Sequence, residues 1–586
     1  MDIKRNLTAI ILIGLVIVLT PTYLRWISPA TEPAVDSTQQ QMSPSPQGAD
    51  PTPVALSETP AAQPVAEKVK TAPIIEKLES EKEIIITVDT DLYIAKISNR
   101  AGGSIVEYTL KNYTGGYNDY GEYDPESLVS LVQDNNNNCT PCLSLYDQDD
   151  KSSRPFVQYF ASDYRDGEKW YLSGEDEKEL HYSLMFEDGR SIDKTIVFKG
   201  NSYTARHDFD LSGFDQTYRQ DFEVLWGNGI KPTEENEKDD LQYSGALMYQ
   251  AGEKDDIMLK DVEPIQRKNF DGNTDWVAVK NKYFMISLMT DSPGKYAALS
   301  AVNTQFGIRE ITPVYSASIG FDIHSQRIST ALFFGPQDYK ILKEQGHALD
   351  DAMNWGFVII KPISKYVILG LLTFLHNPFG DFYINYGLVL IIFALIIRVV
   401  TGPLTKKSAE STQKMQAIQP KMKALQEKYK NDPQKKNSET MALYRKHGVN
   451  PVGGCLPMLI QMPLLFALFT VFRNTIEFRG ADFIFWISDL SQPDVIFDLP
   501  FSIPVYGNGV AILPIVMGVT MFLQQRQSMA TMDKNQRPMM YMMSGFFFLL
   551  FNTFPSGLNL YYAIYNFLSF LQQRSIKAKL ATTPLK

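Results

Sequence analysis

Cysteine and histidine are scarce in this chain, with three and six copies among 586 residues. So few cysteines exclude a disulfide-rich scaffold. No GxxxxGK[ST] sequence occurs, which argues against a P-loop ATPase, and neither an HExxH sequence nor a serine-nucleophile motif is present. We therefore predict a protein that is not an enzyme, with no catalytic residue, no metal site, no cofactor and no direct nucleotide partner.

Negative charge is abundant in the first two thirds of the chain and sparse in the last third. Residues 386–586 contain 21 Lys and Arg against 10 Asp and Glu, whereas the whole chain has a net charge of −10, which leaves −21 for residues 1–385. An acidic first part joined to a basic, apolar second part excludes one uniform soluble globule.

The first apolar stretch, Leu7–Leu24, contains no charge and follows Lys4 and Arg5. Its 18 residues would form a helix of about 27 Å, close to a full membrane span. A cleaved signal peptide is the alternative, because Ser28-Pro29-Ala30 resembles a cleavage site. We favour an uncleaved anchor.

Further apolar stretches lie near the C-terminus, some of them shorter than a comfortable span, which implies tilt or a locally thin bilayer. They are Tyr386–Leu404, Pro457–Phe472, Val510–Leu523, Pro538–Phe554 and Leu558–Leu571, and with the first stretch they predict six spans.

The distribution of Lys and Arg predicts the orientation of these spans. The segment 405–450 carries 11 Lys and Arg against 4 Asp and Glu, so we place it in the cytoplasm together with both termini. The acidic segment 25–385 and the loop 473–509, with only Arg473 and Arg479 as basic residues, then lie outside. Trp355–Leu375 contains Lys361 and Lys365 and is predicted to be an amphipathic helix on the outer surface.

The outer segment begins with a flexible linker and continues as a β-sandwich. Residues 28–80 are rich in Pro, Ser, Gln and Ala. Strand-like runs then begin at Ile84–Val88, Leu92–Ile97 and Ile105–Leu110, with a turn at Gly102-Gly103, and similar runs such as Ser183–Phe186 and Lys194–Phe198 recur to about Phe334.

These patterns divide the chain into successive parts. The expected parts are an anchor (1–27), a linker (28–80), a β-sandwich (81–345), a surface helix (346–380), a five-span core (381–575) that includes a hairpin (405–450), and a basic tail (576–586).

Cys139-Thr140-Pro141-Cys142 forms a CxxC sequence in an Asn-rich loop. A redox site would need a thioredoxin-like βαβ context, and a metal site would need further ligands nearby. On the outer side of a membrane we favour a local disulfide over either chemistry.

Arg398 lies inside the apolar run Leu388–Val400, with no charged partner in that run. Snorkelling to the headgroups is one interpretation, but an intramembrane arginine usually faces the protein interior or a wet cavity. Gln461 and a helical stripe of Asn559, Tyr562, Asn566 and Ser569 supply other polar groups, which could alternatively join helices. We favour a half-channel that opens toward the cytoplasm.

Two other segments have both a structural and a functional interpretation. The fifth span is crowded with Met and Phe, which suits core packing or an adaptable apolar surface. The basic segment is expected to form two helices, Lys406–Lys430 and Gln434–His447, separated by Asn431-Asp432-Pro433, and would serve as a connection or as a docking platform.

Several motifs closely resemble the YidC membrane protein insertase family over residues 345–575. They are the run Asn450–Pro463 (NPVGGCLPMLIQMP), Arg398 followed by Pro403-Leu404-Thr405-Lys406, Gln419-Pro420-Lys421, Met441-Ala442-Leu443-Tyr444, Pro514–Met521 and Phe554–Tyr562. The outer domain matches more loosely, through Thr90–Leu110 and Phe334-Gly335-Pro336.

This resemblance implies a fold and a function. The fold would be an α+β membrane protein, with a polytopic helical bundle, a periplasmic β-supersandwich and a cytoplasmic helical hairpin. The function would be insertion and folding of inner-membrane proteins, alone or with the Sec translocon. The implied partners are nascent membrane proteins, the lipid bilayer, the ribosome and targeting factors.

The resemblance also assigns roles to residues of this chain. A hydrophilic groove would draw in the substrate's polar tail, a slide would pass its apolar helix to lipid, and the hairpin would dock ribosome or targeting factors. The groove residues are Arg398, Gln461, Asn559, Tyr562 and Asn566; the slide residues are Met458, Phe466, Met543, Phe546 and Phe547; the docking residues are Lys421, Lys423, Lys428, Tyr444 and Arg445.

One position departs from the family pattern, because Ala394 stands where some relatives carry a threonine. That departure puts a hydroxyl role at this position in doubt but leaves the groove intact. A small-solute transporter or channel is the main alternative function, and it should show repeats or broken helices that we do not find. A membrane-anchored, sugar-active enzyme is a second alternative.

Overall fold

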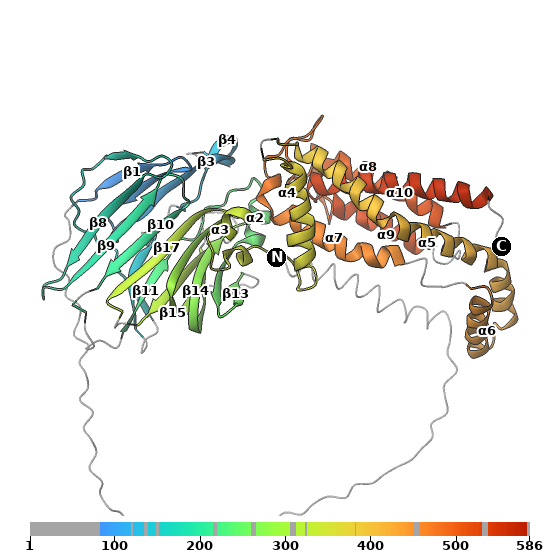
Figure 1. Cartoon of the computed structure of the whole chain (residues 1–586), viewed down its shortest axis with the longest axis horizontal. Helices are drawn as coiled ribbons and strands as arrows, with labels where there is room; N and C mark the ends of the chain where they lie inside the picture. The colour runs from blue at the N-terminus through green and yellow to red at the C-terminus, as the bar shows by residue number, and fades with distance from the viewer. Residues whose placement is uncertain are drawn as a thin grey trace, which may run out of the picture.

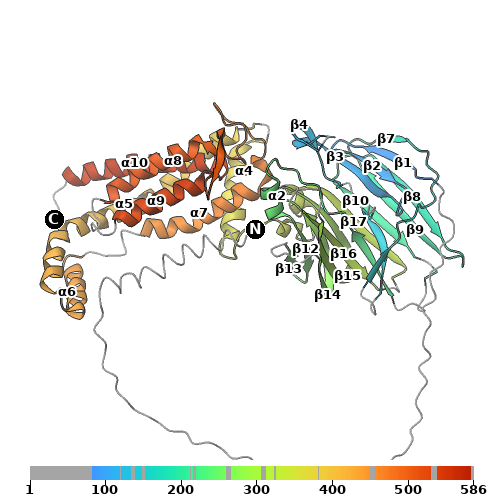
Figure 2. The same cartoon turned by 180° about the vertical axis from the view of Figure 1, so that it is seen from behind.

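The computed structural model describes residues 82–582, except for 119–120, 134–138, 148–151, 212, 215–219, 259–264, 305–311, 323–324, 381, 449–455 and 530–536. The predicted anchor, the linker 28–80 and residues 450–455 of the run Asn450–Pro463 lie outside the described residues. The chain forms a β-sheet domain followed by a helical bundle (Figures 1 and 2).

The β-domain consists of two sheets. The smaller has the order β4-β3-β2-β1-β7, with β1 (Ile85–Asp89), β2 (Tyr93–Ser98), β3 (Ser104–Tyr117), β4 (Tyr123–Ser130) and β7 (Lys169–Tyr171). The larger has a main path β6-β5-β11-β16-β15-β17-β10-β9-β8, to which β12, β13 and β14 are attached through β15. Its strands are β5 (Cys142–Asp147), β6 (Ser152–Pro155), β8 (Glu177–Met185), β9 (Ser191–Lys199), β10 (Thr204–Asp210), β11 (Gln220–Trp226), β12 (Gly245–Gln250), β13 (Glu253–Ile257), β14 (Ile265–Lys280), β15 (Phe284–Thr304), β16 (Thr312–Phe321) and β17 (Arg327–Pro336).

Alternation of apolar and polar residues explains the strands. In β8, Leu180, Tyr182 and Leu184 are buried while their neighbours are more exposed, as expected for a strand with one face on a core. Tyr108 of β3 stacks on Phe334 of β17, which joins the two sheets. The predicted sandwich is therefore confirmed.

Two local features of the sandwich also agree with the sequence. Gly102 and Gly103 form the turn before β3 with positive φ, and a Cβ on Gly103 would lie 2.5 Å from the Ile196 side chain, so a larger residue would clash. Cys139 and Cys142 form a buried disulfide. The preference for a local disulfide is confirmed.

A short helical segment joins the sandwich to the bundle. It comprises α3 (Tyr339–Glu344), the 3-10 helix η1 (Leu349–Ala352), the π-helix η2 (Ile363–Leu369) and α4 (Gly370–His376). In both views α4 runs crosswise to the long helices, at the end of the bundle nearest the sandwich (Figures 1 and 2). That this segment lies on the membrane surface stays a prediction.

The surface helix differs from its prediction in extent and in which face is polar. It begins only after Pro362, because Trp355 is buried beside Tyr339 instead of being helical. Lys365 points inward and pairs with Asp350 of η1, whereas Tyr366 and Phe374 are exposed. The charged residue thus holds the helix to the sandwich joint, and the outward face is apolar.

The bundle contains α5 (Tyr386–Lys428), α6 (Pro433–Lys446), α7 (Leu456–Asn474), α8 (Ile512–Met529), α9 (Arg537–Phe551) and α10 (Ser556–Thr582). The segment between α7 and α8 holds the 3-10 helix η3 (Ile476–Phe478) and the hairpin strands β18 (Val495–Ile503) and β19 (Gly507–Ala511), which the sequence did not predict.

The long helices alternate in direction, as six spans would require. Gly557 at the start of α10 faces Phe472 at the end of α7, and Ala511 before α8 donates its N–H to Asn552 after α9. By length and composition, one described helix, Tyr386–Ser408, could cross a membrane, and Ile363–His376 and Ile512–Gln524 are shorter apolar helices. The count of six stays a prediction.

The expected two-helix hairpin has a different first half. α5 runs without interruption from the apolar run to Lys428, through Pro403 and Pro420, so Lys406–Lys430 is not a separate helix. α6 begins at Pro433, where the Asp432 side chain accepts from the Lys435 N–H, as the predicted break requires. α10 likewise continues to Thr582, into the expected tail.

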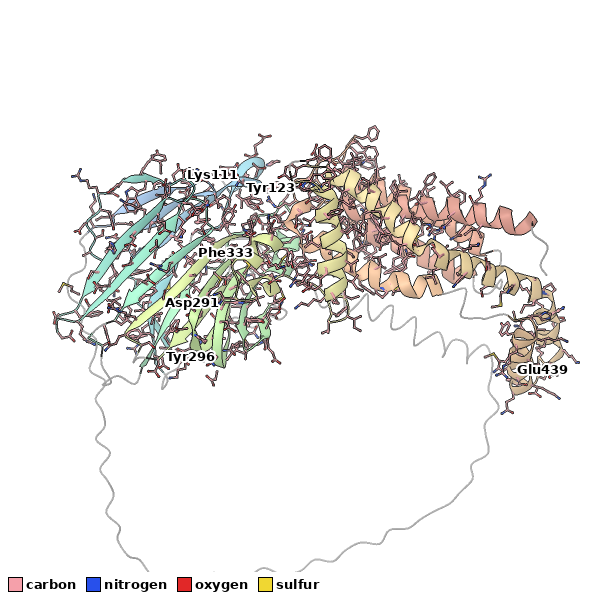
Figure 3. The ribbon with its side chains drawn as sticks, in the orientation of Figure 1. Lys111, Tyr123, Asp291, Tyr296, Phe333 and Glu439 are labelled. Carbon is pink, nitrogen blue, oxygen red and sulfur yellow. A yellow bond between two sulfur atoms is a disulfide. The ribbon has the colours of Figure 1, made fainter. Side chains whose placement is uncertain are left out.

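The sandwich meets the bundle through two arginines, Arg473 at the end of α7 and Arg479 directly after η3. The Arg479 Nε lies 2.7 Å from the Glu234 carboxylate, and its terminal nitrogens donate to the carbonyls of Thr114 and Gly115. Tyr123 of β4 lies at this junction (Figure 3). Arg473 donates to the Tyr243 hydroxyl at the end of α2 (Glu237–Tyr243), at 3.2 Å.

We predict that Arg479→Gln weakens this junction. Removing one partner of a buried ion pair leaves the other charge uncompensated, so the free energy of unfolding should fall by about 3 kcal/mol. Thermal unfolding in detergent measures the loss. Arg327→Gln is the control, because Arg327 also pairs with a carboxylate, that of Asp210, but its side chain is 85% exposed. If the two variants lowered the free energy of unfolding equally, the buried ion pair at the junction would not have the proposed contribution to stability.

Asp240 of α2 gives the junction a pH dependence. Burial, together with the charge of Glu234, raises the pKa of Asp240 to about 7. Because this pKa is above its unfolded value, the contribution to stability is complete below about pH 4 and is lost as the pH rises to about 7, by up to ~4 kcal/mol. Asp240→Asn should flatten that part of the unfolding profile, whereas exposed Asp255→Asn should not. An unchanged slope in the first variant would refute the assignment.

Candidate functional site

Arg398 lies on the face of α5 that packs against α10, and it is only 8% exposed. Its guanidinium carbon lies 5.6 Å from the centre of the Tyr565 ring. The Nε and one terminal nitrogen have no hydrogen-bond partner among the described residues. A buried donor without a partner costs about 1–3 kcal/mol, so this arrangement favours a polar ligand that can accept from it.

The two helices run parallel through this contact. Phe393 packs on Tyr561 at 5.5 Å between ring centres, Arg398 lies over Tyr565, and a Cβ on Gly402 would lie 3.1 Å from Gln572. Glycine at 402 therefore lets α10 approach α5 closely, one helical turn beyond Arg398 on its C-terminal side.

The polar stripe of α10 is buried inside the bundle. Asn559, Tyr562, Asn566 and Ser569 are all less than one tenth exposed. The Tyr562 hydroxyl, the Ser569 hydroxyl and the Gln572 side-chain oxygen have no hydrogen-bond partner among the described residues. Since residues spaced by three or four lie on one helix face, these atoms line the same side of α10 as Tyr565.

Asn559 has a different environment from the rest of the stripe. Its amide donates to the carbonyls of Phe551 and Phe554, at 3.1 and 3.3 Å. These bonds satisfy the end of α9, so Asn559 stabilises the turn between α9 and α10. Gln461 lies half-buried on α7, and no contact described in the structure joins it to Arg398.

Sequence reasoning missed some residues of this site. Tyr565 touches Arg398 most directly, and Gln572 lies one turn beyond Ser569 on the same face. Tyr565 follows Tyr562 by three residues, within the stripe, and Gln572 follows Ser569 by three, so the helical period of the stripe would have found both.

The slide residues do not all share one exposed face. Phe466 is exposed on α7, whereas Phe546 and Phe547 are half-buried, and Phe547 packs against Phe551. The side chains of Met458 and Met543 lie outside the described ones. The exposed apolar residues of these helices are Met462 and Phe466 on α7 and Tyr541, Met542 and Leu549 on α9.

The predicted docking residues occupy the far end of α5 and α6 (Figure 1). Lys421, Lys423, Lys428 and Arg445 are exposed. Tyr444 instead holds the hairpin together, because its hydroxyl lies 3.1 Å from the Met422 sulfur. Lys421 lies 3.4 Å from His447. No group of His, Cys, Asp or Glu within the described residues is arranged to hold a metal ion.

Comparisons with known proteins cover most of the chain. A family model described as 60Kd inner membrane protein matches residues 378–583, and one described as YidC periplasmic domain matches residues 85–367. The membrane protein insertase YidC of Chloroherpeton thalassium is 34% identical over 507 residues, covering 85% of this chain and 84% of that protein. That of Chlorobium limicola is 34% identical over 586 residues, covering 99% and 95%. Solved structures match at TM-scores of only 0.23 to 0.25, too low for inference.

Proposed function

Because this chain belongs to the YidC family of membrane protein insertases, and thus inserts proteins into the inner membrane, we propose that its substrates enter beside Arg398. The polar tail of a nascent protein would occupy the α5–α10 interface from the cytoplasmic side. The observation that carries the proposal is the buried guanidinium, whose Nε and one terminal nitrogen have no hydrogen-bond partner among the described residues.

The chemistry of the interface fits an acidic or polar tail. Arg398 supplies a permanent positive charge, and Tyr562, Ser569 and Gln572 supply hydroxyl and amide groups. Together they would replace hydration lost by the tail, which lowers the free energy of moving it partway across the bilayer.

Apolar parts of the substrate would follow a different route. The exposed side chains of α7 and α9, including Phe466 and Met542, offer an adaptable surface at the edge of the bundle. A substrate helix of about 20 residues gains roughly 25 cal/mol per Å² when its apolar surface leaves water, and this burial would supply the driving force. No nucleotide hydrolysis is needed in this mechanism.

The orientation and partners belong to the same proposal. Six spans would place both termini and the α5–α6 hairpin in the cytoplasm and the sandwich in the periplasm. The exposed Lys423, Lys428 and Arg445 would attract the anionic surface of a ribosome or a targeting factor. Cooperation with the Sec translocon is expected from the family resemblance.

We predict that Arg398→Ala reduces insertion of a substrate with an acidic N-terminal tail. Loss of one favourable charge contact of ~1 kcal/mol lowers the insertion efficiency at least about fivefold. Insertion into inverted vesicles, scored by protection of the tail from protease, measures the effect. Arg398→Lys should retain part of the activity, because it keeps the charge.

The control separates a charge effect from a folding defect. The same substrate with its acidic residues changed to asparagine and glutamine should lose much less with Arg398→Ala. Arg574→Ala, at an exposed position near the end of α10, should leave both substrates unaffected. If both tails lose insertion equally, the charge role is wrong.

A further inference from the structure

The hairpin β18–β19 carries an unusual concentration of exposed apolar side chains. On β18 and the adjoining loops they are Ile484, Phe485, Trp486, Val495, Ile496, Phe497, Phe501 and Val505, which we call the hairpin surface. Val495, Ile496 and Phe497 are consecutive, so apolar groups are exposed on both faces of the strand. No lysine or arginine occurs between Gly480 and Gln525.

Buried polar groups fix this hairpin to the ends of the bundle helices. The Asp494 carboxylate accepts from the Leu513 N–H of α8 at 2.7 Å and from the Trp486 indole at 2.9 Å. The Asn552 amide donates to the carbonyls of Tyr506 and Gly509. The hairpin surface is therefore held at one level, beside the first turn of α8.

Neither water nor the hydrocarbon core suits such a hairpin. A two-stranded sheet with apolar groups on both faces is marginal in water and prone to association. In the hydrocarbon core, its open edges would leave backbone N–H and C=O groups unsatisfied. The boundary between headgroups and acyl chains meets both requirements, solvation of the backbone and burial of the apolar side chains. Backbone groups there reach water, while aromatic side chains enter the apolar layer.

We propose that the hairpin surface inserts into the interfacial layer of the bilayer's outer leaflet. The continuity of the chain supports the lipid bilayer as the partner of this surface. β19 ends at Ala511 and α8 begins at Ile512. The exposed residues Ile515, Val516 and Val519 of α8 extend the apolar surface along the helix. Since the surface has no basic residue, insertion depends on apolar burial and not on anionic lipid. This inference is independent of the groove.

Site-directed fluorescence in proteoliposomes tests the insertion. The full chain, with Cys455 changed to alanine, would carry one environment-sensitive label at Phe501→Cys or at Val505→Cys. The control is Tyr171→Cys on β7, because Tyr171 is also an exposed aromatic, 73% against 60% for Phe501, but lies on the sandwich. Retained insertase activity identifies correctly folded labelled protein.

The hairpin labels should be quenched by lipids with a nitroxide near the headgroup, more than by lipids with a deep nitroxide, and should resist aqueous iodide. The Tyr171 label should show the reverse. Phosphatidylcholine vesicles and vesicles with added phosphatidylglycerol should give the same quenching. Iodide quenching equal to that at Tyr171, protection from both quenchers by a protein surface, or quenching only in anionic vesicles would each overturn the proposal.

Discussion

The parallel packing of α5 against α10 is the constraint on which the rest of the bundle depends. It places Arg398 against Tyr565 instead of against a carboxylate, and the buried polar stripe of α10 occupies neighbouring positions of the same helix. A carboxylate partner would neutralise the arginine and leave little for a substrate. An aromatic face holds the guanidinium in position while its N–H groups stay available for hydrogen bonds. Positioning without neutralisation is what a transient binding site for a polar tail requires.

The junction explains the two basic residues of the otherwise acidic segment 473–509. Lys and Arg are disfavoured in translocated loops, so Arg473 and Arg479 need a compensating role in the proposed orientation. Both are buried against acceptors from the sandwich, the carboxylate of Glu234 and the hydroxyl of Tyr243. An acidic residue of the β-domain, Glu234, therefore pairs with a basic residue of the bundle where the two parts meet.

Local periodicity predicted much of the fold, and long-range partners account for what it missed. Strands such as β8 and β9 follow from period-two alternation, and the stripe from Asn559 to Ser569 follows from the helical period. The pairing of Lys365 with Asp350 reverses the expected polar face of the surface helix, because an amphipathic pattern cannot show whether a lysine faces water or a buried carboxylate. The hairpin β18–β19 was missed because consecutive apolar residues do not alternate.

For the candidate site, composition and spacing identified Arg398 and most of its neighbours but not their different roles. Asn559 and Tyr562 share one stripe, yet the first is committed to the α9 carbonyls and the second has an unbonded hydroxyl. The two residues differ because α9 ends at Phe551 and a short turn leads to α10, which places the α9 carbonyls within reach of Asn559. A sequence pattern gives the face of a helix; the element packed against that face decides what each residue does.

This difference supports a polar path that ends inside the bundle. From Tyr565 to Asn559, α10 rises about 9 Å toward the sandwich end. Beyond Tyr562, aromatic rings pack together, because Phe551 packs on Tyr562 and Phe554, and Phe554 packs on Phe469. The Asn559 amide at this level is already bonded to the carbonyls of Phe551 and Phe554. Arg473 lies over the last two rings, 4.8 Å from Phe469, and is itself bonded to the sandwich. In the proposed mechanism, a polar tail that advances past Arg398 would thus exchange hydrogen-bonding partners for packed rings, which opposes a continuous conduit and favours release of apolar segments sideways into lipid.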